Sequence, residues 1–109
     1  MIQEKMITHK TTKLINNYTI TKAVEKVTGK PFKILQGASR VSSVVSARNL
    51  CFKIAKDHLF LADREIAIFF NRDRSAITYA LNNIDKKLEN RPQYKLTLEA
   101  VERELGLRN

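Results

Sequence analysis

The sequence is poor in the residues that cross-link or break up small domains. It contains three glycines, two prolines, no tryptophan and one cysteine, Cys51, in 109 residues. A single cysteine excludes an internal disulfide and is typical of the reducing cytoplasm. No apolar run approaches the roughly 20 residues that cross a bilayer, and the first residues lack the apolar core of a secretory signal. So few glycines and prolines leave little room for β-turns. We therefore expect a cytoplasmic, all-α domain.

Acidic residues are missing from one long stretch. Seven basic residues and no acid lie between Glu25 and Asp57, namely Lys26, Lys30, Lys33, Arg40, Arg48, Lys53 and Lys56. The net charge is +9, and residues 1–58 hold +8 of it. A one-signed stretch repels itself unless a polyanion neutralises it, so this asymmetry favours a nucleic-acid partner. No strongly basic amphipathic helix with bulky apolar anchors is present, which disfavours a membrane surface.

Patterns typical of enzymes and metal sites are also missing. His9 and His58 are isolated, and no cluster of Cys, His and Asp has metal-ligand spacing. The Gly-x-x-x-x-Gly-Lys-Ser/Thr loop that binds nucleotide phosphates is absent. Cys51 lies on the apolar side of its segment, where a thiol is normally packed and inert. We expect no catalytic residue, no metal, no cofactor and no ATPase activity.

Helical periodicity is strongest between Ala62 and Leu88. An apolar stripe of Ile77, Leu81, Ile84 and Leu88 follows the 3.6-residue period, and Asp73 stands where an N-cap belongs. The pattern predicts a helix over Asp73–Leu88. Its opposite face holds hydrogen-bonding and cationic side chains without a carboxylate: Arg72, Ser75, Tyr79, Asn82, Asn83 and Lys86. Such a face is typical of a helix that approaches phosphates and base edges.

A shorter apolar segment precedes this helix. Asp63 as a cap and Glu65 in the first turn favour a helix over Asp63–Phe70. The connection at Asn71 and Arg72 is so short that the two helices must form a tight corner, as in a helix–turn–helix. The alternative is an ordinary pair of antiparallel helices with one face in water.

The other segments complete a bundle of about five to six helices. We expect helices over Thr19–Thr28, ended by Gly29, over a short piece around Phe32–Leu35, over Ala47–His58 with Ser46 as its cap, and after Pro92. The serine-rich segment Ala38–Ser46 is expected to be a loop. We assign residues 1–18 to an arm or short helix and residues 19–109 to the domain.

Three segments resemble the C-terminal DNA-binding domain of the bacterial replication initiator DnaA, a helix–turn–helix of the Trp-repressor type. Ile20–Leu35 is similar to its first two helices. Ser46-Ala47-Arg48-Asn49-Leu50 through Lys56 is similar to the Pro-Arg-Gln-hydrophobic helix after its basic loop. Glu65-Ile66, Phe70 and Arg72-Asp73-Arg74-Ser75-Ala76-Ile77 resemble the signature E-I…F-G-G-R-D-H-[ST]-[ST]-V.

The sequence departs from the family pattern around the predicted turn. Asn71 replaces two glycines, so the turn is one residue shorter, although asparagine tolerates the left-handed conformation. Arg74 replaces the family's histidine, and Ala76 its second hydroxyl residue. Ser42 occupies the position of an arginine associated with the minor groove, whereas Arg40 is retained.

The resemblance implies double-stranded DNA binding with a sequence preference, at a replication origin or promoter. The helix Asp73–Leu88 is expected to enter the major groove, with Asp73, Arg74, Ser75 and Tyr79 at base edges and Ala76 and Asn83 on the same face. Arg40, Arg48, Lys56 and Arg72 are expected at phosphates or in the flanking minor groove. Two alternatives concern single residues: Asp73 as a cap alone, and Tyr79 as a half-buried ring.

Two other functions remain open from the residues. The domain could have kept the fold and bind a protein of the replication or transcription machinery, and its oligomeric state is not determined. An RNA-binding role is less favoured, because interleaved aromatic residues for single-stranded bases are lacking. DNA binding requires a basic surface that spans both residues 47–58 and the face of residues 72–86, whereas a protein partner does not.

Overall fold

The computed structural model describes residues 14–109, and within that range the chain forms six α-helices and no β-strand. The helices are α1 (Asn17–Thr28), α2 (Phe32–Gln36), α3 (Ser42–Leu59), α4 (Asp63–Phe70), α5 (Arg74–Asn90) and α6 (Pro92–Glu104). The predictions of an all-α bundle and of its number of helices are confirmed. No helix in this range is both long and apolar enough to cross a membrane.

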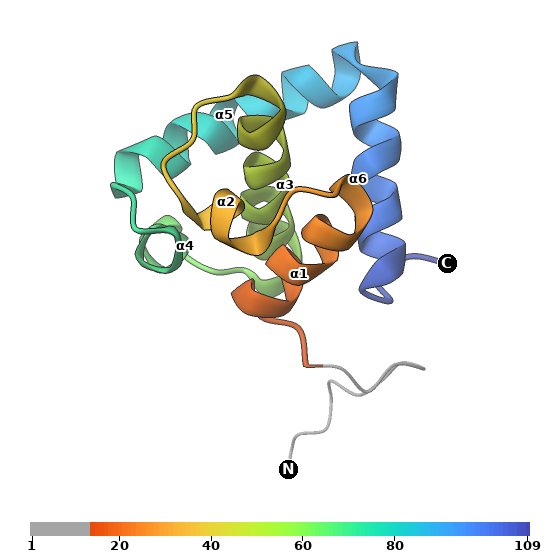
Figure 1. Ribbon diagram of the computed structural model, residues 1–109, viewed down its shortest axis with the longest axis horizontal. Helices are drawn as coiled ribbons and strands as arrows, with labels where there is room; N and C mark the ends of the chain where they lie inside the picture. Colours follow the sequence, from red (N-terminus) through yellow and green to blue (C-terminus); the bar gives the residue numbers. More distant parts are fainter. Residues whose placement is uncertain (1–13) are drawn as a thin grey trace.

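Helix α3 lies at the centre of the bundle (Figure 1). It packs against α1, α2, α4 and α5, while α6 packs against α1 and α5. All six helices contribute side chains that are buried in one core: Ile20, Val24, Leu35, Leu50, Ile54, Ile66, Phe70, Ile77, Ile84, Val101 and Leu105. Because the apolar stripe of α5 belongs to this core, the polar face of that helix is turned to solvent.

Cys51 is part of the core, as its position in the sequence indicated. It is 1% exposed, and burial raises the pKa of its thiol to about 12. The thiol is therefore protonated at neutral pH and unsuited to nucleophilic chemistry.

Helices α3 and α4 differ from the sequence prediction at their N-termini, α3 in its first residue and α4 in its cap. Helix α3 begins at Ser42, with Val41 at the N-cap, so half of the expected serine-rich loop is helical. Val44 in this segment is 6% exposed, and its burial against the core outweighs the weak helix propensity of the serines. In α4 the N-cap is Ala62, whose N–H donates to the Glu65 carboxylate at 2.9 Å. Asp63 is the first helical residue and not the cap.

Helix α1 begins with a capping box, in which Asn16 and Thr19 bind each other's backbone. The Asn16 side chain accepts from the Thr19 N–H at 2.9 Å, and the Thr19 hydroxyl accepts from the Asn16 N–H at 2.8 Å. Helix α1 therefore begins at Asn17, two residues before its predicted start, and ends at Gly29 with φ of 77°. The expected arm over residues 1–18 falls outside the described range except for residues 14–18.

Candidate nucleic-acid interface

The connection between α4 and α5 is a tight corner built on Asn71. This residue has φ of 53° and ψ of 52°, the left-handed conformation that ends a helix. The Arg72 N–H donates to the Ala67 carbonyl at 2.9 Å, and α5 starts two residues later. Phe70 and Ile77, on the two sides of the corner, are both fully buried. The predicted helix–turn–helix is confirmed, with asparagine in the conformation that the shorter turn requires.

Helix α5 presents its polar face to solvent. The exposed side chains on it include those of Arg74, Ser75, Ala76, Tyr79 and Asn83. Tyr79 is 73% exposed, so it is not the half-buried ring considered as an alternative. The Asn83 amide donates one hydrogen bond to the Tyr79 carbonyl at 2.7 Å, which leaves its oxygen and second hydrogen available to other partners.

Asp73 occupies the predicted N-cap position of α5 but makes no capping hydrogen bond with its side chain. Its backbone carbonyl accepts from the Ala76 N–H at 3.0 Å, and its side chain is exposed. The prediction of Asp73 as the N-cap residue is confirmed, and the predicted hydrogen bond between its side chain and the first turn is absent. Among the described residues the carboxylate has no hydrogen-bond partner, so it is available as an acceptor at the tip of α5.

Arg48 does not lie on the surface, and our expectation of a phosphate contact is corrected here. The residue is 4% exposed. Its guanidinium donates to four backbone carbonyls, those of Leu35 at 2.7 Å, Gly37 and Ser39 at 3.1 Å, and Ile34 at 3.3 Å. Burial and the neighbouring charge of Arg72 lower the pKa of Arg48. The side chain fastens the C-terminus of α2 and the following loop onto α3.

Arg72 is bound in the same manner from the helix–turn–helix corner. Its guanidinium donates to the carbonyls of Phe70 at 2.8 Å and of Gln36 and Gly37, and burial lowers its pKa. The side chain is half-buried. We call Arg48 and Arg72, with the carbonyls of residues 34–37 and 39, the carbonyl clamp. Within the described residues neither arginine forms an ion pair, so no carboxylate neutralises either charge.

Two neighbouring hollows join the loop before α3 to the face of α5. The first is lined by residues of the loop and the corner, including Ser39, Arg40, Arg48, Asn71 and Arg72. The second lies between α3 and α5 and is lined by Val45, Arg48, Asn49, Phe52, Arg72, Ala76, Tyr79, Ala80, Asn83 and Lys87. No acidic side chain lines either hollow. Arg40 is exposed, and the structure thus brings it onto one surface with the start of α5.

Lys56 lies near the other end of α3 and is paired within the protein. Its ammonium is 2.7 Å from the Asp63 carboxylate, which also accepts from the Thr78 hydroxyl at 2.6 Å. Lys53 is paired similarly, at 2.9 Å from both Asp57 and Asp85. The basic residues of α3 therefore have partners in the fold, whereas Arg40 on the loop and Arg74 and Lys86 on α5 are exposed and form no ion pair within the described residues.

Sequence reasoning missed the internal partners of Arg48, Arg72 and Lys56. The carbonyl partners of Arg48 are nine to fourteen residues away, and the Asp63–Thr78 contact spans fifteen. A helical projection shows on which side a residue lies but not which neighbouring element it meets. The sequence did contain one indication of these partners, which is Gly37 at the end of α2. A helix leaves its last carbonyls without intrahelical partners, and glycine has no side chain near them, so a nearby arginine can donate to them.

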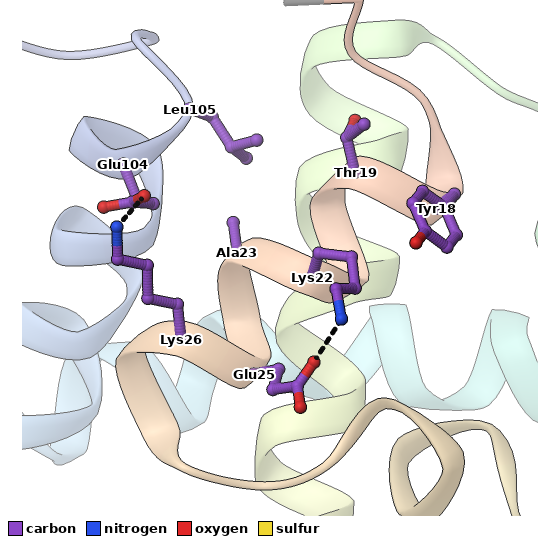
Figure 2. A pocket seen from close by; sticks show the side chains of 8 residues that line it. All are labelled: Tyr18, Thr19, Lys22, Ala23, Glu25, Lys26, Glu104 and Leu105. Carbon is purple, nitrogen blue, oxygen red and sulfur yellow. Dashed lines mark ion pairs between the residues drawn. The ribbon is translucent and has the colours of Figure 1, made fainter.

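A separate hollow between α1 and α6 has a different character (Figure 2). Its lysines are each paired with a carboxylate, Lys22 with Glu25 at 3.0 Å and Lys26 with Glu104 at 2.9 Å. Paired charges of both signs do not favour a polyanion, which distinguishes this hollow from the surface at α5. In residues 14–109, no group of three or more His, Cys, Asp or Glu side chains is arranged to hold a metal ion.

The tight corner between α4 and α5, together with the exposed polar face of α5, places the protein in the helix–turn–helix class. The family of the bacterial DnaA helix–turn–helix matches residues 18–84, which is more than half of the chain. The chain belongs to this DNA-binding family, and the resemblance seen in the sequence is confirmed. A search of curated proteins gave no match. The matched region runs from α1 through most of α5 and so includes the loop, the corner and the exposed face.

Proposed function

We propose that the protein binds double-stranded DNA with a sequence preference by inserting the N-terminal half of α5 into the major groove. Arg74, Ser75 and Tyr79 reach base edges from the exposed face. Asp73 accepts from a cytosine amino group, Ala76 offers a methyl contact, and Asn83 extends the same row. Arg40 binds the flanking backbone or minor groove from the loop before α3.

The observation that supports this proposal most strongly is the composition of the surface around the corner. Arg40 is exposed beside two arginines that are not paired with a carboxylate, and no carboxylate lines the adjoining hollows. Phosphates of a duplex lower the electrostatic energy of such a surface. Lys56 contributes a phosphate contact only where a phosphate competes with Asp63, so we give it a peripheral role. Arg48 and Arg72 act indirectly, through the backbone carbonyls that they bind.

We further propose that the site of action is a replication origin or a promoter. The chain has no nucleotide-binding phosphate loop, so it would occupy DNA without hydrolysing ATP.

A protein-binding function is the second candidate, because Lys53 and Lys56 are paired with carboxylates and Arg48 is buried, so α3 exposes little free positive charge. The test is fluorescence anisotropy with a labelled mixed-sequence duplex at near-physiological salt, followed by selection from a random pool. Arg74→Ala should weaken binding, whereas Arg103→Ala, on the exposed side of α6, should not. Absence of binding to any duplex would favour the protein partner.

A further inference from the structure

We infer that Arg48 and Arg72 are positioning residues, which fix the loop of residues 38–40, with Arg40, relative to α5 through the carbonyl clamp. This inference rests on the proposed DNA binding. Arg48 comes from α3 and Arg72 from the corner before α5, and both donate to the Gly37 carbonyl. One peptide group thus connects the central helix, the end of α2 and the helix–turn–helix.

The end of α2 needs these donors. A helix leaves its last carbonyls without intrahelical partners, and α2 has only five residues. The carbonyls of Ile34, Leu35 and Gln36, and of Gly37 after them, all accept from Arg48 or Arg72. Two positive charges at this point also interact favourably with the negative end of the helix dipole. The Gln36 side chain adds a third connection, because it donates to the Phe69 carbonyl of α4 at 2.9 Å.

The loop that follows has few other restraints. Within residues 38–40 the only hydrogen bonds in the described structure involve Ser39: its carbonyl accepts from Arg48 at 3.1 Å, and its hydroxyl accepts from the Val41 N–H at 3.2 Å. Arg40 has no partner of its own there and is exposed. The position of its backbone therefore depends on the clamp immediately before and beside it.

The clamp has a consequence for DNA binding. A protein that uses two contacts on one duplex gains from both only when their spacing is fixed before binding, since ordering a loop otherwise costs conformational entropy. The clamp fixes the spacing between Arg40 and the first turn of α5. No carboxylate is paired with its two charges, so they raise the positive potential over this surface without touching a phosphate.

The first test measures loop protection without DNA. Trypsin cleaves after Arg40 only when the loop opens, and the fragments are identified by mass spectrometry. Arg72→Lys keeps the charge but lacks the planar fork that reaches several carbonyls at once. We expect cleavage at Arg40 to be about tenfold faster in Arg72→Lys and in Arg48→Lys, at unchanged circular dichroism, since loss of charge-assisted hydrogen bonds opens the loop. Arg103→Lys is the matched control. Unchanged cleavage in both clamp variants would overturn the inference.

The second test is a double-mutant cycle on binding to the mixed-sequence duplex. If the clamp positions Arg40, Arg40→Ala should cost about tenfold in Kd in the wild type and less than about twofold in the Arg72→Lys background. Equal losses in both backgrounds would show that the two arginines act independently and would also overturn the inference. Should the wild type bind no duplex, the proposed function fails while the protease test still decides the clamp. If Arg48→Lys does not fold, the half-buried Arg72→Lys alone supplies both measurements.

Discussion

The carboxylate of Asp63 accepts a hydrogen bond from the hydroxyl of Thr78 at 2.6 Å, which joins the first residue of α4 to the second turn of α5. The other oxygen of this carboxylate is 2.7 Å from the Lys56 ammonium of α3. Three helices therefore meet at one side chain, on the side of α5 next to the face that we propose enters the groove. The charge of that carboxylate therefore contributes to the contact between these helices.

Asp63 should make the stability of the domain pH-dependent. The hydrogen bonds from Lys56 and Thr78 lower its pKa below the ordinary value of 3.8. The folded state thus holds the proton less tightly than the unfolded state, and the stabilisation is present above pH 3.8 and lost as the pH falls through the folded pKa. We expect Asp63→Asn to cost about 1 kcal/mol at pH 7 and less at pH 3, measured by urea denaturation. Asp85→Asn, at a 72% exposed side chain, should cost less at pH 7.

Stability and binding should separate along α5. Ile84 is 2% exposed and Tyr79 is 73% exposed, although they belong to the same helix. Ile84→Ala removes a packed side chain and should cost about 2–5 kcal/mol in the free energy of unfolding. Tyr79→Ala should change that free energy by less than about 0.5 kcal/mol and still weaken DNA binding. Loss of folding in Tyr79→Ala would show that the ring is structural.

Much of the helical bundle follows from sequence pattern because apolar periodicity and capping residues are local. The stripe of α5 predicted a helix from Asp73 to Leu88, and the observed helix is Arg74–Asn90. The same local rules failed at Ser42, where burial of Val44 extends α3 into serines. They also failed at Arg48, because the position of its side chain is determined by carbonyls of another helix. The exposed face of the candidate site could be predicted, and its internal supports could not.

The salt dependence of binding should reflect the free cations and not the total number of basic residues. Arg40 and Lys86 are exposed, whereas Lys53 is held by Asp57 and Asp85. Neutralising about four phosphates gives log K against log[salt] a slope of about −4. Arg40→Gln should reduce the magnitude of this slope by about 1, and Lys53→Gln should leave it unchanged. A slope near zero in the wild type would favour a protein partner.

The preferred DNA sequence should differ from that of the DnaA family because the residues at the tip of α5 differ. Arg74 offers two parallel donors that suit O6 and N7 of guanine, worth about 1–3 kcal/mol of discrimination. If Arg74 contacts a phosphate instead, it adds affinity without selectivity. Ala76 has no hydroxyl, so it can offer only a methyl contact, for instance to thymine. Ser42, where the family has an arginine associated with the minor groove, lies in the first turn of α3 and cannot replace it.

Selection from a random duplex pool, run on the wild type and on the double variant Arg74→His with Ala76→Thr, measures this difference directly. We expect the wild type to select a guanine-containing motif unlike the family's site, or to show only a shallow preference over mixed DNA. The double variant restores two family side chains and should shift the selected motif toward the family's site. The corner at Asn71 stays one residue short in both proteins, so the shift should be incomplete. A wild type that already selects the family's site with a steep preference would show that Arg74 and Ala76 do not determine specificity.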